Sequence, residues 1–150
     1  MCDFGFAVWC GGRKLSSVCG SPQYMAPELS NKREPYLGYP VDVWALCAVV
    51  YEMLHGKPAF RGSSMEQLGI RIMRVSHEGF GPEASPAARS FIKRGFVLDP
   101  IKRCSMSELS AHAWLGIFAK ATPSAEAASV AEMTQEVAEV LPITDELEIE

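Results

Sequence analysis

The sequence predicts a mainly α-helical body over residues 41–115, followed by an acidic tail over residues 116–150. Two features predict the body: helix start signals precede apolar segments, and the alternating pattern of strands is nearly absent. Charge predicts the tail, because residues 121–150 contain acids and no Lys or Arg, whereas all 14 bases lie before them. Such a change near Lys120 indicates a folded body and a separate, solvated segment.

Composition bounds the class of protein. Hydrophobic residues make up 48% of the chain, which is enough for a packed core. The five cysteines form no C-x-x-C pair, so the sequence predicts reduced thiols and a cytoplasmic or nuclear protein rather than a disulfide framework or zinc site. The longest apolar stretch contains Asp42 and Glu52 and is too short to span a bilayer. We expect neither a membrane nor a nucleic-acid partner.

The first 40 residues and the segment after them differ in pattern. Residues 6–40 are rich in Gly, Ser and Pro and show no sustained period, which predicts a long ordered loop. Val41–His55 is apolar around nearly its whole circumference, which predicts a helix buried on all sides. Pro40 just before it and Gly56 just after it are suited to its two ends.

Three further helices are predicted from Ser residues that suit the N-cap position. Ser63 with Glu66 forms a capping box that opens a helix to about Met73. Ser85 with Pro86 opens a helix to about Leu98, with inward-facing Phe91 and Ile92, and Ser105 with Glu108 opens a short helix toward Trp114. Gly95 falls inside the second of these helices, where it costs about 1 kcal/mol relative to Ala.

Five motifs follow one another along the chain, and their order is more specific than any of them alone. They are Asp3-Phe4-Gly5, Cys19-Gly20-Ser21-Pro22-Gln23-Tyr24-Met25-Ala26-Pro27-Glu28, Asp42-Val43-Trp44-Ala45-Leu46, Gly56-Lys57-Pro58-Ala59-Phe60 and Asp99-Pro100-Ile101-Lys102-Arg103. In order and spacing they resemble the eukaryotic-type Ser/Thr protein kinase family, from the DFG motif to the end of the C-terminal lobe. The resemblance implies a partial kinase domain over 1–115, with an activation segment at 3–28 and a helical subdomain at 41–115. The complete domain of the family is α+β.

The resemblance assigns the metal site to Asp3. Phosphoryl transfer needs a hard carboxylate to hold Mg²⁺ against the phosphates of ATP, and the Asp of the DFG motif supplies it in this family. Phe4 then packs inward and Gly5 gives the backbone its freedom. Without the other motifs, Asp3 would be an ordinary solvated acid.

The activation segment contains two kinds of candidate site. Ser17 is the first candidate for an activating phosphate and Ser16 the second, with ordinary loop serines as the alternative. Ser21 before Pro22 is typical of kinases that phosphorylate Ser and Thr, and its hydroxyl is expected to bond the catalytic Asp and the phosphate-contacting Lys. The resemblance therefore implies Ser/Thr protein substrates.

The resemblance also assigns an ion pair and two residues of the helix that follows Pro40. Glu28 and Arg103 are expected to form a buried ion pair that holds the activation segment against the helices. Asp42 either accepts backbone N–H bonds from a catalytic loop, as in the family, or caps its own helix, and Trp44 packs in the core. Cys47 stands where the family usually has glycine, which puts close packing at that turn in doubt.

Several parts of a complete kinase do not occur in these 150 residues. There is no G-x-G-x-x-G loop and no His-Arg-Asp, so no catalytic base is assigned here and it is expected upstream. We expect the chain alone to be inactive, with weak or no binding of ATP and Mg²⁺. The alternatives are a pseudokinase-like module that binds a partner through its surface and tail, with one amphipathic helix at residues 126–141, and a fragment that folds poorly.

Overall fold

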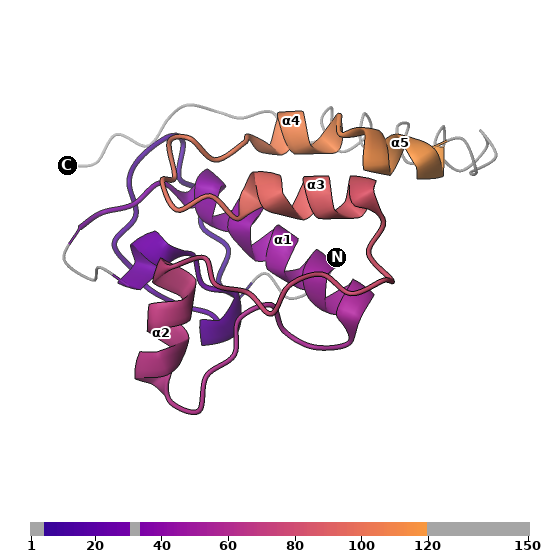
Figure 1. Ribbon diagram of the computed structural model, residues 1–150. Coiled ribbons are helices and arrows are strands. Elements are labelled where there is room, and N and C mark those ends of the chain that lie inside the picture. Colours follow the sequence, from indigo (N-terminus) through magenta and orange to yellow (C-terminus); the bar gives the residue numbers. More distant parts are fainter. Residues whose placement is uncertain (1–4, 31–33, 120–150) are drawn as a thin grey trace, which may run out of the picture. The chain divides into compact units, whose positions relative to one another are not determined.

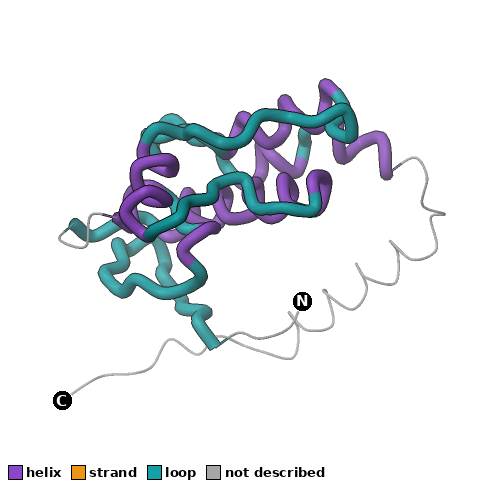
Figure 2. Tube along the Cα trace, turned by 60° about the horizontal axis from the view of Figure 1, so that its bottom comes forward, coloured by secondary structure: helices purple, strands orange, loops and turns teal. Residues whose placement is uncertain are grey.

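The computed structural model of the chain describes residues 5–30 and 34–119. Within them it contains two 3-10 turns and five α-helices (Figure 1), namely η1 (Pro22–Tyr24), η2 (Pro27–Ser30), α1 (Gly38–His55), α2 (Met65–Met73), α3 (Pro86–Gly95), α4 (Met106–Ser110) and α5 (Ala113–Ala119). The described part has no strand, only an isolated antiparallel bridge between Leu15 and Tyr36. The prediction of a mainly α body is confirmed, and Figure 2 shows how much of the remaining path is loop.

The chain divides into two compact units, Met1–Trp114 and Leu115–Glu150. The first holds α1 to α4 and the start of α5. Of the second, the structure describes only residues 115–119, which end α5. The helix predicted at residues 126–141 lies outside the described residues, so it stays a prediction. None of the described helices is long and apolar enough to cross a membrane.

Helix α1 begins at Gly38, three residues before its predicted start. Pro40 is therefore inside the first turn, where its missing N–H would have had no intrahelical partner. The N-cap residue is Leu37, whose side chain makes no capping hydrogen bond. The suggestion that Asp42 caps this helix is therefore wrong. The predicted end is confirmed: Gly56 adopts the left-handed conformation (φ 67°) and its N–H bonds to Glu52 O.

Only part of the circumference of α1 is buried, so the prediction of burial on all sides is wrong for the described residues. One side faces α3 and its loops and buries Val43, Trp44, Cys47, Ala48 and Tyr51. The opposite side is exposed along a row that we call the α1 stripe, consisting of Tyr39, Asp42, Leu46, Val49 and Met53. These positions recur every three or four residues, so they share one face of the helix. Met53 is 79% exposed.

Helices α1 and α3 lie side by side (Figure 1) and approach most closely at Cys47 and Gly95. A Cβ on Gly95 would overlap the Cys47 side chain, with only 2.8 Å to Cys47 Cβ and 3.1 Å to Val43 O. Gly95 is also the last residue of α3 and does not lie in its middle. The predicted destabilisation by a glycine inside the helix is therefore wrong. The sequence put close packing at Cys47 in doubt. The two helices still pack closely there, because Gly95 has no side chain.

Helix α2 opens one residue later than predicted. Its N-cap is Ser64, whose Oγ accepts from Gln67 N at 3.1 Å, and not Ser63 with Glu66. Gln67 Oε1 accepts instead from Ser63 N at 2.8 Å. Both serines precede an acidic or amide residue by three positions, so the sequence pattern fits either register. Ile72 is buried and Leu68 is half-buried on the same side of the helix.

For the last helices, the predicted starts are confirmed and the predicted ends are wrong. Ser85 caps α3, with Pro86 first in the helix, and Ser105 with Glu108 forms both bonds of a capping box. Helix α3 stops at Gly95 rather than near Leu98, because Phe96 turns into the core against Trp44, with 5.0 Å between their ring centroids. The segment toward Trp114 is two helices, α4 and α5, separated at Ala111 and His112.

Candidate functional site

Most side chains between Gly5 and Gly20 are exposed, including the large apolar Phe6 (77%) and Trp9 (82%). Two backbone bonds between Leu15 and Tyr36, of 2.8 and 2.9 Å, attach this segment to the chain ahead of α1. The Tyr36 hydroxyl also donates to the Ser17 carbonyl oxygen. The Ser16 and Ser17 side chains remain exposed, so both candidate phosphorylation sites are accessible.

The chain then folds into η1 and η2, which carry the motif around Ser21 and Glu28. Gly20 permits this turn because its φ is +105°, which side chains rarely adopt. Ser21 is exposed and its side chain makes no capping hydrogen bond to η1. Pro22 opens η1. The arrangement leaves the Ser21 hydroxyl available to a group outside the described residues.

A tyrosine that the sequence analysis did not single out connects η1 to α1. Tyr24 OH donates to Glu52 Oε2 at 2.6 Å, and Gln23 Nε2 donates to the same hydroxyl at 3.1 Å. Glu52 is the single acid in the apolar C-terminal half of α1, and an acid inside an apolar helix is a signal that it has a polar partner. The partner itself, 28 positions away, could not be read from that signal.

Glu28 and Arg103 are brought together at the base of this segment. Arg103 Nη1 and Nη2 donate to the two Glu28 carboxylate oxygens at 2.8 and 2.9 Å. The Arg103 side chain is 0% exposed and that of Glu28 13%. Arg103 also donates to Pro40 O at 2.6 Å and to Val97 O at 3.1 Å. One guanidinium thus joins η2, the start of α1 and the loop after α3.

An aromatic layer supports the guanidinium from the core side. The Arg103 guanidinium carbon lies 5.2 Å from the centroid of the Trp44 ring, within cation–π range. Trp44 is itself stacked on Phe60, with centroids 5.3 Å apart and an interplanar angle of 13°. Motifs that are far apart in the sequence therefore meet in one buried cluster, and Trp44 packs in it.

Asp42 is exposed on the α1 stripe, between Tyr39 and Leu46. Partial desolvation raises the pKa of Asp42 above its ordinary value. A carboxylate among exposed apolar side chains at the start of a helix is suited to accept N–H bonds from a further segment that packs there. The described residues supply no such segment.

An apolar groove of about 600 Å³ lies between the segment of residues 16–30 and α2. Val18, Pro22 and Met25 line it from the segment, and Met65, Leu68 and Ile72 from α2. The Ser16 side chain lies at the same groove, and Ser21 precedes Pro22. The arrangement can hold an apolar peptide side chain close to the segment that contains the candidate phosphorylation sites.

The DFG motif is only partly described. Asp3 and Phe4 lie outside the described residues, and Gly5 begins them as an exposed turn residue. Within residues 5–30 and 34–119 no group of three or more His, Cys, Asp or Glu side chains could hold a metal ion. Four cysteines of the described part, Cys10, Cys19, Cys47 and Cys104, are free thiols.

Comparison with known proteins agrees with this geometry. The family model described as "Protein kinase domain" matches residues 1–115. Calcium/calmodulin-dependent protein kinase type 1B of Rattus norvegicus is 38% identical over 116 residues, covering 75% of this chain and 33% of that protein. Probable serine/threonine-protein kinase CCRP1 of Zea mays is 34% identical over 120 residues, covering 77% of this chain and 19% of that protein.

These matches define the class: the chain belongs to the protein kinase family and carries part of a protein kinase domain. Its curated relatives are protein kinases of the Ser/Thr type, and ATP with Mg²⁺ is what this family uses. The chain spans about a third of the length of the mammalian relative and about a fifth of the maize one.

Proposed function

We propose that these residues supply the activation segment and the substrate-docking half of a kinase that transfers the γ-phosphoryl group of ATP to Ser and Thr hydroxyls of proteins. The observation that carries the proposal is the two-bond ion pair between Glu28 and Arg103. It fixes the end of the activation segment to the helices, so that Ser21 and the apolar groove keep a defined position on the body.

The residues of the chain divide the work in this proposal. Asp3 holds Mg²⁺, which neutralises charge on the phosphates when ATP is bound. The Ser21 hydroxyl orients the catalytic groups of the upstream part, and the groove between Val18, Pro22 and α2 receives a side chain of the protein substrate. A phosphate on Ser17, with Ser16 as the second candidate, adds nearly two negative charges, and Arg13 and Lys14 are the neighbouring bases.

The α1 stripe is the surface on which the rest of the kinase domain packs in this proposal. Tyr39, Leu46, Val49 and Met53 expose apolar area, and Asp42 adds a carboxylate to accept backbone N–H bonds. The pseudokinase-like binding module is not favoured, because the relatives are kinases and Ser21, Glu28 and Arg103 are all retained. The free thiols suit an intracellular protein.

A chimera tests the proposal. The region of the rat calcium/calmodulin-dependent protein kinase type 1B that precedes its matched part is joined to this chain. The chimera is expected to phosphorylate a Ser-containing peptide and not the same peptide with Tyr, whereas the 150-residue chain alone transfers no phosphate. A folded, ATP-binding chimera that phosphorylates neither peptide contradicts the proposal, and so does one that prefers Tyr.

A further inference from the structure

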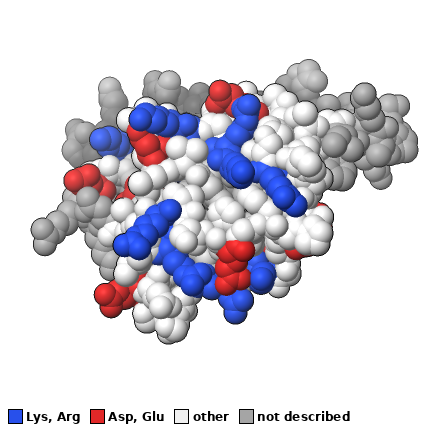
Figure 3. All heavy atoms as spheres, viewed as in Figure 1, with Lys and Arg blue, Asp and Glu red and all other residues white. Residues whose placement is uncertain are grey.

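Helix α3 has a surplus of positive charge that the proposed kinase function does not use. It carries Arg89, Lys93 and Arg94 and no acidic residue. Together with Pro86 and Ser90 these side chains line an open hollow of about 510 Å³ on the surface. Figure 3 shows Lys and Arg side chains grouped over the region where Figure 1 draws α3.

Arg89 is held in place before any ligand arrives. Its Nε donates to Ala84 O at 2.8 Å and its Nη2 to Gly81 O at 3.0 Å. Its guanidinium carbon lies 6.0 Å from the centroid of the Phe80 ring, and Lys93 Nζ lies 5.8 Å from the same centroid. The fold therefore holds two cations against one aromatic ring, an arrangement that favours an anion beside them.

The described residues do not neutralise this charge. None of the ion pairs within residues 5–30 and 34–119 involves Arg89, Lys93 or Arg94. The effect of Arg94 on the pKa of Glu108 is the smallest of several, after the hydrogen bonds from Ser105. Lys93 instead acts on His77. Burial is the main cause that lowers the pKa of this imidazole, and the positive charge of Lys93 adds to it.

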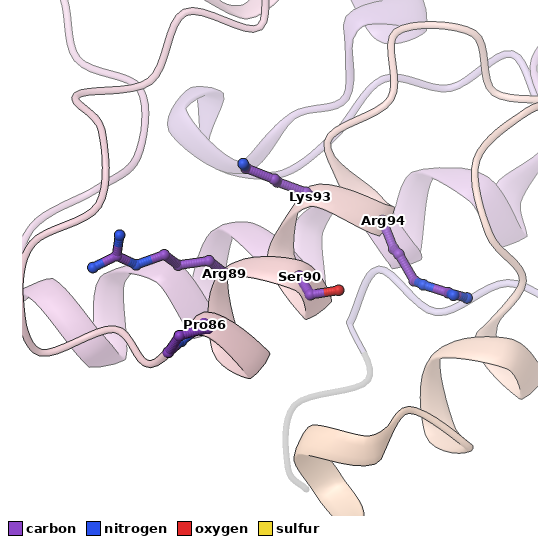
Figure 4. Close-up of a pocket in the computed structure, with 5 residues that line it drawn as sticks. All are labelled: Pro86, Arg89, Ser90, Lys93 and Arg94. Carbon is purple, nitrogen blue, oxygen red and sulfur yellow. The ribbon is translucent and has the colours of Figure 1, made fainter.

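We propose that the exposed surface of α3 binds an acidic peptide segment of a partner protein. Figure 4 shows that the three cationic groups do not converge: Arg89 and Lys93 project to one side of α3 and Arg94 to the other, with Ser90 between them. Separate cations along a helix fit successive carboxylates of a chain better than one phosphate, which two convergent donors would clamp. Alternate residues of an extended peptide are about 7 Å apart and neighbouring turns on a helix face about 5–6 Å, a difference that the long Arg and Lys side chains can span.

Two other anionic partners fit less well. Two N–H donors of Arg89 already bond to backbone oxygens. A bidentate bond from Arg89 to a phosphate would have to compete with these two bonds. Residues 1–120 carry 14 Lys and Arg against 10 Asp and Glu, which is a small excess compared with the strongly basic domains that bind nucleic acids.

Fluorescence anisotropy with the full 150-residue chain tests the proposal. The probes are a labelled peptide of alternating Glu and Gly, its Gln–Gly counterpart, inorganic phosphate and a short RNA. We expect the Glu–Gly peptide alone to bind, and its affinity to fall by roughly tenfold when the salt rises from about 0.05 to 0.3 M. No binding of that peptide, or tighter binding of phosphate or RNA, overturns the proposal.

Charge-reversal variants localise the binding. Lys93→Glu with Arg94→Glu is compared with Arg74→Glu with Lys102→Glu, which changes the net charge equally at exposed positions outside α3. The first pair is expected to weaken peptide binding about tenfold and the second less than about twofold. Equal losses in both pairs mean that only the net charge matters and contradict the proposal. If the first pair unfolds, Lys93→Met makes the same comparison with Lys102→Met.

Discussion

Glu28 and Arg103 are 75 positions apart in the sequence, yet two N–H···O bonds of 2.8 and 2.9 Å join them and so attach η2 to the loop between α3 and α4. The guanidinium makes two further bonds to backbone oxygens, of Pro40 and Val97. It thus joins the end of the activation segment to two parts of the helical body. Loss of either partner would leave a charge in a largely dry site.

Arg103→Ala is expected to lower the free energy of unfolding by roughly 3–5 kcal/mol, because it leaves the Glu28 carboxylate without its partner. Arg103→Lys should recover only part of this loss, since an ammonium cannot make the two parallel bonds. Urea unfolding measures both, with Lys102→Ala, which is exposed, as the matched control at under about 0.5 kcal/mol. An Arg103→Ala loss no larger than the control's would show that the pair is not a fixed point of the fold.

Gly95→Ala should destabilise the chain by about 1–3 kcal/mol, because the new Cβ overlaps Cys47. In a Cys47→Gly background the same change should cost markedly less, since the atoms it meets are gone. A double-mutant cycle by urea unfolding measures this coupling. Costs for Gly95→Ala that are equal in the two backgrounds would contradict the close approach of α1 and α3 at these residues.

Stability is expected to fall on acidification through His77. Burial lowers the pKa of His77, and the positive charge of Lys93 and the nearby His55 act in the same direction. The unfolded chain then binds the proton more readily, so this contribution is present above about pH 6.5 and is lost as the pH falls through the lowered value.

Unfolding free energies at several pH values test this. His77→Gln should flatten the dependence in that range, because Gln does not titrate. A profile that His77→Gln does not alter would assign the dependence to another group.

The α1 stripe predicts self-association of the isolated chain, because exposed apolar side chains on one helix face invite contact. Val49→Lys with Met53→Lys should shift sedimentation toward the monomer. Ile101→Lys, at a residue that is 86% exposed but off the stripe, is the control for added charge. If the native chain is monomeric, or if Ile101→Lys shifts sedimentation toward the monomer equally, the α1 stripe is not the surface through which the chain associates.

The sequence predicted the features that depend on local chemistry. The caps at Ser85 and Ser105 and the end of α1 at Gly56 follow from side chains and backbone freedom within a few residues, and the structure confirms them. The register of α2 was one residue off because Ser63 and Ser64 offer the same spacing. Only the hydrogen bonds of Gln67 with Ser63 and Ser64 distinguish the two starts.

Features that depend on the approach of distant segments were beyond the sequence. The contact of Cys47 with Gly95 requires the spacing of two helices, and the bond from Tyr24 to Glu52 requires the path of η1. Burial around α1 was overestimated for a related reason. Apolar side chains on all sides of a helix predict that other segments cover them. They do not predict that those segments belong to the described residues.

The rate of phosphate transfer by the chimera, with and without Asp3→Ala, tests the central claim most directly. If this chain supplies the metal-binding carboxylate and the docking half of a Ser/Thr kinase, the unaltered chimera phosphorylates the Ser peptide. Asp3→Ala then lowers its rate by about 100-fold or more while the free energy of unfolding stays the same. Equal rates for the two chimeras, or transfer that is abolished in both although each is folded and binds ATP, would contradict the account.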